Sequence, residues 1–435
     1  MMHRLLALVA LQTLAGFSPD AESRADDQRL QQIETYVAEY VDMAAFDGVV
    51  LIAEQDSSVW EKGFGSASYE NALPMTAETV FRIASLSKQV TKAAIGRLID
   101  QNKLKLDSRL DEFLPEFPNA RRITIRQLVE HSAGIAHTNR LDWMDMRKSM
   151  TLDAIVANLA NERLLFEPGK GYQYSNGGYA LLARVIEIAS GTSYGDFIAA
   201  EFAARGYPSI GHEVAHVAVA SMANRYSPGP VYGERVLADT YVTANRIGGG
   251  SLYANARDLL HFFRDTYSGA LLSTATTAEL FPLPEDGDVQ ITGRSPGALA
   301  QVYLDFDERL AVVTLSSNSA WPASFNTDIV SLYRGDEVSL TPFTLDHATL
   351  PDVEWMAVSG DFVADRFGWQ VSIVRKDQQF VFVQDQIQTA FARTTDGEFY
   401  LPIYDWLCRY GDYGMDFECR QRDPNADIRF NFARR

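Results

Sequence analysis

Strand-like segments lie at both ends of a long, mostly helical stretch, and this order constrains the fold more than any other feature of the sequence. Near the N-terminus, two apolar runs are joined by polar turn residues and predict a β-hairpin. After the helical stretch, three more apolar runs are separated by short polar loops that favour hairpin connections. The runs cover residues 48–53, 59–64, 289–292, 298–304 and 310–316. This order predicts an α+β fold, in which one antiparallel sheet is flanked by helices and carries an α-rich subdomain.

Periodicity and composition divide the rest of the chain. Apolar residues recur at helical spacing over 30–41, 87–100 and 326–334, which predicts helices that pack on the sheet. Beyond a boundary near 338–351, short apolar stretches alternate with charged turns and predict a small antiparallel β-barrel. The predicted domains cover residues 27–337 and 345–435.

Length and charge exclude several classes of protein. The chain has 435 residues, about three times the size of an average domain, so a single small module is excluded. Hydrophobic residues make up 46% of it, enough to bury a core and to exclude bulk disorder. The formal net charge of −18 would repel phosphate backbones and anionic headgroups, so nucleic acid is not expected as a partner.

The first residues of the chain predict export. A short basic start that includes Arg4 precedes an apolar run over 5–16. This run has the length of a signal peptide, whereas a transmembrane helix needs about 20 apolar residues. We expect a signal peptide over 1–21, export to the periplasm or the exterior, and no stable membrane span after its removal. The alternative is a buried N-terminal helix.

The two cysteines fit the same compartment. Cys408 and Cys419 flank the turn residues Gly411 and Gly414, which suits a hairpin disulfide in an oxidising environment. The alternative is a pair of free thiols.

Two short motifs carry side chains suited to nucleophilic catalysis. A Ser-x-x-Lys sequence at the start of a predicted helix places Ser85 and Lys88 on one helix face. A serine hydroxyl is a poor nucleophile until a base removes its proton, and a lysine whose pKa is lowered by its surroundings can be that base. In a Gly-rich loop, Tyr174 can relay a proton and Asn176 can orient a substrate amide. Taken singly, Ser85 could be a helix cap, Lys88 a solvated side chain and the loop a plain turn.

Together and in this order, the motifs resemble those of the serine hydrolases of the class C β-lactamase and D,D-peptidase type, a family that includes penicillin-binding proteins and esterases. The resemblance covers about 49–318 and includes the segments 123–135, 168–176 and 248–259. It implies a β-lactamase-like serine hydrolase domain that cleaves an ester or amide, such as a D-amino-acid peptide, an acyl ester or a β-lactam, with no metal and no cofactor. The C-terminal domain is similar to the lipocalin-like appendage of some relatives.

The resemblance also implies a role for each motif residue. Ser85 would attack an acyl carbonyl, Lys88 and Tyr174 would handle the protons, and water would release the acyl-enzyme. Asn176 would hold the substrate, and the backbone N–H groups of Ser85 and Arg294 would stabilise the oxyanion.

The third motif departs from the family's pattern. Relatives place lysine or histidine before a small residue and glycine, whereas this chain has Ile291, Thr292 and Gly293. Isoleucine supplies no charge, so Arg294 substitutes for the cation, or the substrate lacks the carboxylate that the cation binds, or the activity is weakened. We expect Thr292, Gly293 and Arg294 to bind the acyl group. We also expect neutral esters or amides to be better substrates than β-lactams or peptides with a free carboxylate.

Two alternatives come from other classes of protein. His212-Glu213-x-x-His216 has the spacing of a zinc-peptidase helix, but β-branched residues follow it, and surface histidines are the simpler interpretation. A catalytically silent binding protein would keep the fold and the cleft without forming an acyl-enzyme, which Ile291 leaves open. The expected partner of the hydrolase is a small acyl or peptide substrate, and the sequence leaves its oligomeric state open.

Overall fold

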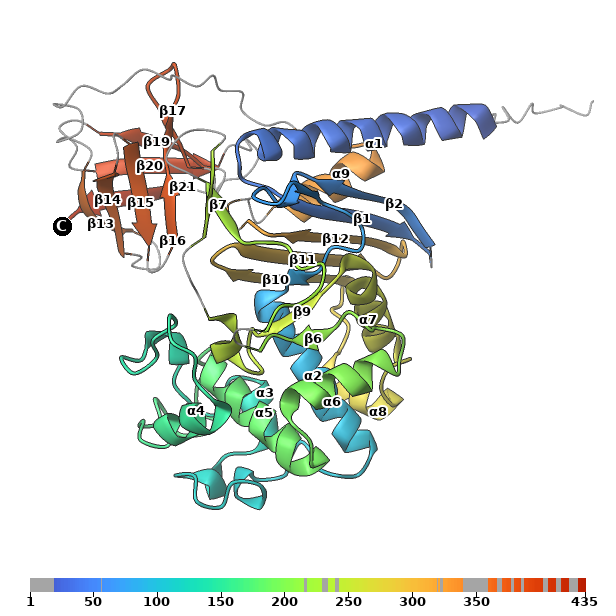
Figure 1. Ribbon diagram of the computed structural model, residues 1–435, viewed down its shortest axis with the longest axis vertical. Coiled ribbons are helices and arrows are strands. Elements are labelled where there is room, and N and C mark those ends of the chain that lie inside the picture. Colours follow the sequence, from blue (N-terminus) through green and yellow to red (C-terminus); the bar gives the residue numbers. More distant parts are fainter. Residues whose placement is uncertain are drawn as a thin grey trace, which may run out of the picture.

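The computed structural model contains a five-stranded sheet with helices on both faces, a mostly helical region beside it, and a second, curled sheet near the C-terminus (Figure 1). The described residues are 19–55, 57–214, 217–228, 234–238, 242–318, 320, 324–338, 359–365, 370–376, 379–384, 387–401, 406–411, 416–421 and 429–435. This arrangement confirms the predicted α+β class, with one antiparallel sheet, an α-rich subdomain and an antiparallel C-terminal unit.

The five-stranded sheet joins the two ends of the main domain. Its order is β10-β11-β12-β1-β2, and each neighbouring pair is antiparallel. The two early strands therefore complete a sheet with the three late ones, as the order of apolar runs predicts. The strands are β1 (Gly48–Glu54), β2 (Ser57–Phe64), β10 (Asp288–Ser295), β11 (Ala298–Asp305) and β12 (Leu310–Ser316).

One helix precedes the first strand of the sheet, another follows its last strand, and further helices lie between β2 and β10 in the sequence. The predicted helix over 87–100 is α2, and the predictions over 30–41 and 326–334 lie within α1 and α9. The α-helices are α1 (Pro19–Asp42), α2 (Ser87–Asp100), α3 (Ile125–Val129), α4 (Leu152–Leu159), α5 (Asn176–Ser190), α6 (Tyr194–Ala203), α7 (Ala256–Ser268), α8 (Thr274–Leu280) and α9 (Phe325–Arg334). The 3-10 turns are η1 (Ala84–Leu86), η2 (Leu110–Glu112), η3 (Ala120–Arg122), η4 (Thr138–Arg140) and η5 (Thr243–Arg246).

Strand β1 is apolar along most of its length because both faces of the sheet are covered. Val49 and Leu51 belong to the hydrophobic core that contains α2 and α7. Val50 and Ile52 point to the other face and pack in a second core with α1 and α9. Figure 1 shows these helices in separate layers on either side of the sheet. Complete burial of each of these side chains contributes about 1.5–3 kcal/mol, which fixes the sheet between its two helical layers.

Short strands connect the sheet to the helical region. Strand β9 lies between β5 and β6, and two small hairpins, β3-β4 and β7-β8, complete the main domain. These strands are β3 (Ser66–Ser68), β4 (Leu73–Pro74), β5 (Phe81–Arg82), β6 (Gly211–His212), β7 (Tyr226–Pro228), β8 (Arg235–Leu237) and β9 (Leu252–Ala254).

The C-terminal strands form a curled antiparallel sheet, which confirms the antiparallel unit predicted as a small barrel. The order of the nine-stranded sheet is β16-β15-β14-β13-β21-β20-β19-β18-β17. Its two edge strands, β16 and β17, are consecutive along the chain, with Phe391 alone between them. The strands are β13 (Gly360–Ala364), β14 (Gln370–Lys376), β15 (Gln379–Gln384), β16 (Ile387–Ala390), β17 (Ala392–Arg393), β18 (Phe399–Leu401), β19 (Trp406–Tyr410), β20 (Asp416–Gln421) and β21 (Arg429–Arg434).

Aromatic packing and a disulfide hold the curled sheet together. The rings of Phe417 and Phe432 stack with their centroids 4.4 Å apart, in the same hydrophobic cluster as Val50 of β1. Apolar contacts therefore link this sheet to the face of the main sheet that α1 covers. Cys408 and Cys419 are register partners on β19 and β20 and form a buried disulfide, which confirms the predicted pairing.

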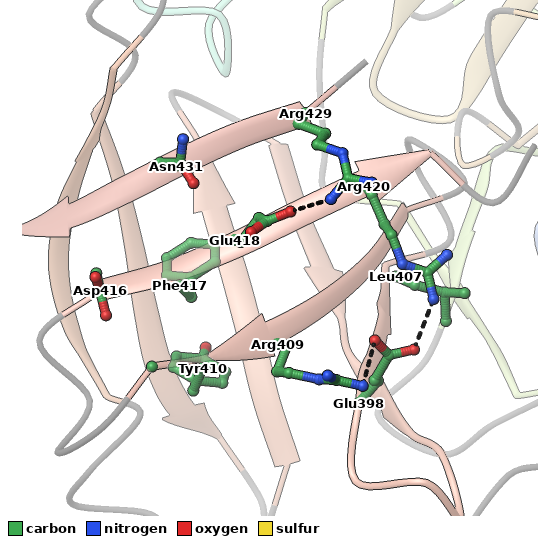
Figure 2. Close-up of a pocket in the computed structure, with 11 residues that line it drawn as sticks. Glu398, Leu407, Arg409, Tyr410, Asp416, Phe417, Glu418, Arg420, Arg429 and Asn431 are labelled. Atoms are coloured by element: carbon green, nitrogen blue, oxygen red, sulfur yellow. Dashed lines mark hydrogen bonds and ion pairs between the residues drawn. The ribbon is translucent and has the colours of Figure 1, made fainter. Parts of the chain in front are cut away.

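The polar face of the curled sheet carries a ladder of ion pairs (Figure 2). Glu398 accepts from Arg420 at 3.0 Å and pairs with Arg409 at 3.2 Å, while Glu418 pairs with Arg429 at 2.8 Å. These residues line a cavity of about 400 Å³. Opposite charges brought together in this way neutralise one another across this surface.

Several expectations fall on residues outside those described. Residues 1–18 of the predicted signal peptide, 1–21, are not among the described residues, and α1 begins at Pro19. The predicted domain boundary also lies largely outside them, within 339–358. Among the residues that are described, no helix has both the length and the apolar character needed to cross a membrane.

Replacing both cysteines should destabilise the curled sheet. The disulfide closes a short loop, with a sequence separation of 11 residues, and the chain-entropy model gives such a bridge about 3 kcal/mol of stabilisation. We expect the Cys408→Ala/Cys419→Ala variant to lose about this free energy of unfolding in urea titrations. Reductant should lower the stability of the parent to the same level and leave the variant unchanged. Equal stability of parent and variant without reductant would contradict the prediction.

Candidate active site

Ser85 lies in the 3-10 turn η1, directly before α2, rather than in the first turn of the α-helix as the motif predicts. The preceding residue, Ala84, is fully buried and has a φ of +44°, in the left-handed region that L-residues rarely adopt. Such a conformation costs on the order of 1–3 kcal/mol and persists where the surrounding structure enforces it. Ser87, which follows, accepts a hydrogen bond from the backbone N–H of Leu252 at 3.1 Å. The nucleophile motif is thus anchored on both sides of Ser85.

The Tyr174 hydroxyl meets Ser85. It donates a hydrogen bond to Ser85 Oγ at 2.7 Å, although the two residues are 89 positions apart in the sequence. Burial raises the pKa of Tyr174, while the hydrogen bond to Ser85 and the charge of Arg246 act in the opposite direction. The phenol is therefore protonated at neutral pH and can hold the serine oxygen in place.

Lys88 is buried behind this pair, and no carboxylate of the described residues forms an ion pair with it. Its ammonium nitrogen donates to Asn176 Oδ1 at 2.6 Å and to the Gly249 carbonyl at 2.5 Å. It also lies 4.5 Å from the centroid of the Tyr174 ring. Burial, reinforced by the charge of Arg246, holds the pKa of Lys88 well below its usual value. A lysine in this setting can be neutral at physiological pH and can accept a proton.

Two histidines hold the turn that carries Tyr174. The backbone N–H of Ser175 donates to His131 Nδ1 at 3.1 Å, and the N–H of Asn176 donates to His137 Nδ1 at 3.2 Å. The His131 ring also packs against Tyr174, with centroids 4.7 Å apart. Because each Nδ1 accepts a hydrogen bond, both imidazoles are neutral in this arrangement. They fix the turn, and α5 begins directly after it at Asn176.

Strand β10 brings the third motif to the nucleophile. A Cβ atom added at Gly293 would lie 2.8 Å from the backbone nitrogen of Ser85, so only glycine fits there. Ile291 and Thr292 line the same cavity as Ser85. Arg294 is the next residue of β10, in register with Leu299 on β11, and its side chain is not part of the cavity lining.

The cavity at Ser85 has a volume of about 550 Å³. Of the sequence-predicted residues, it is lined by Ser85, Lys88, Tyr174 and Thr292; Asn176 contacts the site through Lys88, and Gly293 contacts it through the Ser85 backbone. Among the residues that the structure describes, none beyond Thr292 lines this cavity.

The zinc-peptidase interpretation is wrong in its structural premise. His212 lies on strand β6, not on a helix, and its ring packs against Tyr194 with centroids 5.4 Å apart. Arg82 binds the Glu213 carboxylate through two hydrogen bonds of 2.8 and 2.9 Å. His216 lies outside the described residues, and those that are described contain no group of histidine, cysteine and acidic side chains suited to a metal ion.

Sequence reasoning missed several residues of this site. His137 and Arg246 lie just outside the segments 123–135 and 248–259, and no helical or strand-like spacing marks either of them. Lys92 was detectable: it follows Lys88 by four residues and therefore lies on the same face of α2, one turn farther on.

Comparison with known proteins agrees with the site geometry. The model of the Beta-lactamase family matches residues 33–331. The chain belongs to the beta-lactamase family. This confirms the resemblance that the motifs at Ser85 and Tyr174 carry.

Individual relatives are similar to this chain over part of its length or at low sequence identity. Penicillin-binding protein 4* of Bacillus subtilis is 39% identical over 159 residues, which are 35% of this chain and 35% of that protein. The matches to this and the next curated relatives span about a third to a half of their length. The D-amino acid amidase of Ochrobactrum anthropi SV3 has a TM-score of 0.60 at 19% identity, covering 71% of this chain and 97% of the amidase. A penicillin-binding protein homologue from Pyrococcus abyssi, described as octameric, has a TM-score of 0.59 at 18% identity, covering 92% and 99%. These two similarities concern the fold.

Gly293→Ala should disrupt the site. Its new Cβ would lie 2.8 Å from the backbone nitrogens of Ser85 and Leu86, so β10 or η1 must shift. Misplacing reacting groups by about 1 Å can cost about a hundredfold in rate, and we expect a loss of this order in the rate of Ser85 modification. Gly178→Ala is the matched control, because every neighbour of its new Cβ would lie at 3.7 Å or more. Equal rates for the two variants would contradict the proposed packing of β10 against the nucleophile.

His131 and His137 should titrate well below the usual range. Burial, followed by the nearby charge of Lys88, lowers the pKa of each to about 4. The unfolded chain therefore binds these protons more readily than the folded chain, so stability falls as pH drops from about 6.5 towards 4. We expect imidazole NMR signals of the folded protein to titrate near 4. A His131→Gln/His137→Gln variant should lose less stability over this pH range than the parent, and titration near 6.5 in the folded parent would contradict the assignment.

Proposed function

We propose that the protein is a serine hydrolase that cleaves an ester or amide through an acyl-enzyme on Ser85. One observation carries the proposal: the Tyr174 hydroxyl lies 2.7 Å from Ser85 Oγ, beside a buried lysine with a strongly lowered pKa. This combination supplies a nucleophile, a proton donor and a base within one cavity. A protein that only bound its ligand would have no need for a desolvated lysine at this point.

In the proposed acylation step, neutral Lys88 accepts the proton that Ser85 gives up as Oγ attacks the carbonyl carbon. Burial acts in opposite directions on the two candidate bases, because it disfavours the charged form of each. It lowers the pKa of Lys88 and raises that of Tyr174, so the amine is the base and the phenol remains protonated. Tyr174 then donates its proton to the leaving group and recovers one from Lys88. Water releases the acyl group by the reverse sequence.

The oxyanion is proposed to bind two backbone N–H groups, those of Ser85 and Arg294. Strand β10 is an edge strand of its sheet, so one of its sides is not used in pairing with β11. Such an edge offers backbone donors to a ligand. The close approach of Gly293 to the Ser85 nitrogen supports this placement, because it brings β10 against the turn that holds the nucleophile. Removing one oxyanion donor typically costs about 10²- to 10³-fold in rate.

We assign substrate contacts to Asn176 and Thr292, and we take the substrate to be a small ester or amide. The amidase with the same fold is named for amides of D-amino acids, which supports acyl transfer from an amide or ester as the reaction class. The remaining alternatives are an acyl ester, a peptide and a β-lactam.

We also propose that residues 27–337 form the hydrolase domain, that 345–435 form a separate lipocalin-like domain, and that the protein is exported to the periplasm or the exterior. The Cys408–Cys419 disulfide supports export, since such bonds persist in oxidising compartments. The basic and apolar first residues point the same way.

Incubation with a fluorophosphonate or a labelled penicillin should add one covalent group to Ser85. Intact mass spectrometry measures the adduct, and peptide mapping locates it. Ser85→Ala should show no adduct, and Lys88→Met should form it about 10²- to 10⁴-fold more slowly, because proton transfer is lost. Adduct formation on Ser85→Ala at the parental rate would overturn the mechanism. A folded parent that none of these reagents or esters modifies would favour the silent binding protein.

A further inference from the structure

A second lysine lines the cavity at Ser85. Lys92 lies on α2 about one helical turn beyond Lys88, about 6 Å farther along the axis, and its side chain is part of the cavity lining. Its ammonium nitrogen lies 4.0 Å from the centroid of the Phe281 ring, which lines the cavity too. The cation is thus held against an aromatic wall within the space that a bound substrate would share with Ser85.

Lys92 forms no ion pair with the residues that the structure describes. No carboxylate of the described residues lies within 4.0 Å of its ammonium nitrogen. Acidic side chains do line the cavity, but both face Arg126, which lies 2.8 Å from Glu279 and 4.0 Å from Glu130. Burial lowers the pKa of Lys92 to about 8, so most of the molecules carry the positive charge at pH 7.

The cavity on the curled sheet is a useful contrast. Its arginines, Arg409, Arg420 and Arg429, each pair with a glutamate of the same surface (Figure 2). Those charges stabilise the sheet and need no ligand. Among the described residues, Lys92 has no carboxylate within 4.0 Å, and a partly buried cation in this position is stabilised by a ligand that supplies an anion.

We propose that Lys92 and Phe281 form an anion subsite in the cleft, and that the substrates are acyl compounds bearing a carboxylate that binds the Lys92 ammonium. This inference rests on the proposed function of Ser85 and names its substrate class. It also revises the expectation drawn from Ile291. That residue lines the same cavity and supplies no charge, but α2 supplies a cation to the cavity from another side. A substrate carboxylate therefore has a partner here that the third motif does not reveal.

The test compares matched esters that differ in one carboxylate. On the acyl side the pair is 4-nitrophenyl hydrogen glutarate and 4-nitrophenyl valerate; on the leaving-group side it is 3-carboxyphenyl butyrate and phenyl butyrate. The proteins are the parent, Lys92→Met, Lys92→Arg and Lys103→Met. The last variant is the control, because it removes an equal charge from an exposed lysine just after the end of α2. For each protein, the ratio of kcat/KM for the carboxylate ester to kcat/KM for the neutral ester is taken. Comparing this ratio between proteins cancels the difference in intrinsic reactivity of the two esters.

In at least one pair, Lys92→Met should lower the ratio of carboxylate to neutral ester by about tenfold or more, since a hydrogen bond to a charged group is lost. Turnover of the neutral ester should stay within about threefold of the parent. Lys92→Arg should retain most of the ratio, and Lys103→Met all of it. An unchanged ratio in both pairs, or an equal loss on both members, would overturn the subsite while leaving the Ser85 mechanism intact.

A binding measurement decides the same question without turnover. Calorimetric titration of Ser85→Ala with 3-carboxyphenyl butyrate and with glutarate gives affinities that do not depend on acylation. Adding Lys92→Met should weaken binding of at least one of them by about tenfold. If Ser85→Ala and Ser85→Ala/Lys92→Met bind each compound with equal affinity, the subsite is overturned. If the parent neither hydrolyses the esters nor is labelled at Ser85, the proposed function fails, and this titration still decides whether Lys92 binds a carboxylate.

Discussion

Burial of Lys88 is the constraint on which the site depends. An ammonium group removed from water is costly unless a charge compensates it, and the described hydrogen-bond acceptors of Lys88 are the neutral oxygens of Asn176 and Gly249. The amine therefore tends to lose its proton, which is what a base for Ser85 requires. The same two hydrogen bonds tie α2 to the start of α5 and to the glycine-rich turn before β9. The group proposed as the base is thus also a link between three segments distant in sequence.

The sheet gives this link its rigid frame. Helix α2 is packed in the core on one face of the sheet, while α1 and α9 form a second core on the other. The edge strand β10 is then pressed against η1, where Gly293 leaves room for the Ser85 backbone. Two well-packed faces hold the nucleophile, although Ala84 beside it has a strained conformation. Strain of this kind survives because the packing around it cannot relax.

Much of this architecture could be predicted from the sequence, because its signals are local. Apolar runs gave β1, β2 and β10 to β12, and helical periodicity gave α2. The meeting of Tyr174 with Ser85, 89 positions away, was instead expected from the family resemblance of their two motifs. The supports could not be predicted in the same way. His137 accepts a hydrogen bond from Asn176 through a loop, and Arg246 acts on Lys88 by proximity alone, so neither leaves a periodic pattern in the chain. The zinc-peptidase interpretation of the H-E-x-x-H spacing was wrong for the opposite reason. The local pattern was present, but His212 lies on strand β6 and not on a helix.

Charge in a binding site is a property of the cavity and not of one motif position. Electrostatic interaction depends on distance in space, and a cation that enters from α2 acts on a ligand as well as one that enters from β10. Ile291 and Lys92 line the same cavity, so the apolar residue in one element and the cation in another have to be considered together. A shift of the cation from strand to helix would also change the direction from which the carboxylate is bound. Relatives with the same fold could then select substrates of different shape while keeping Ser85, Lys88 and Tyr174 in place, because the residues that recognise charge are separate from those that move protons.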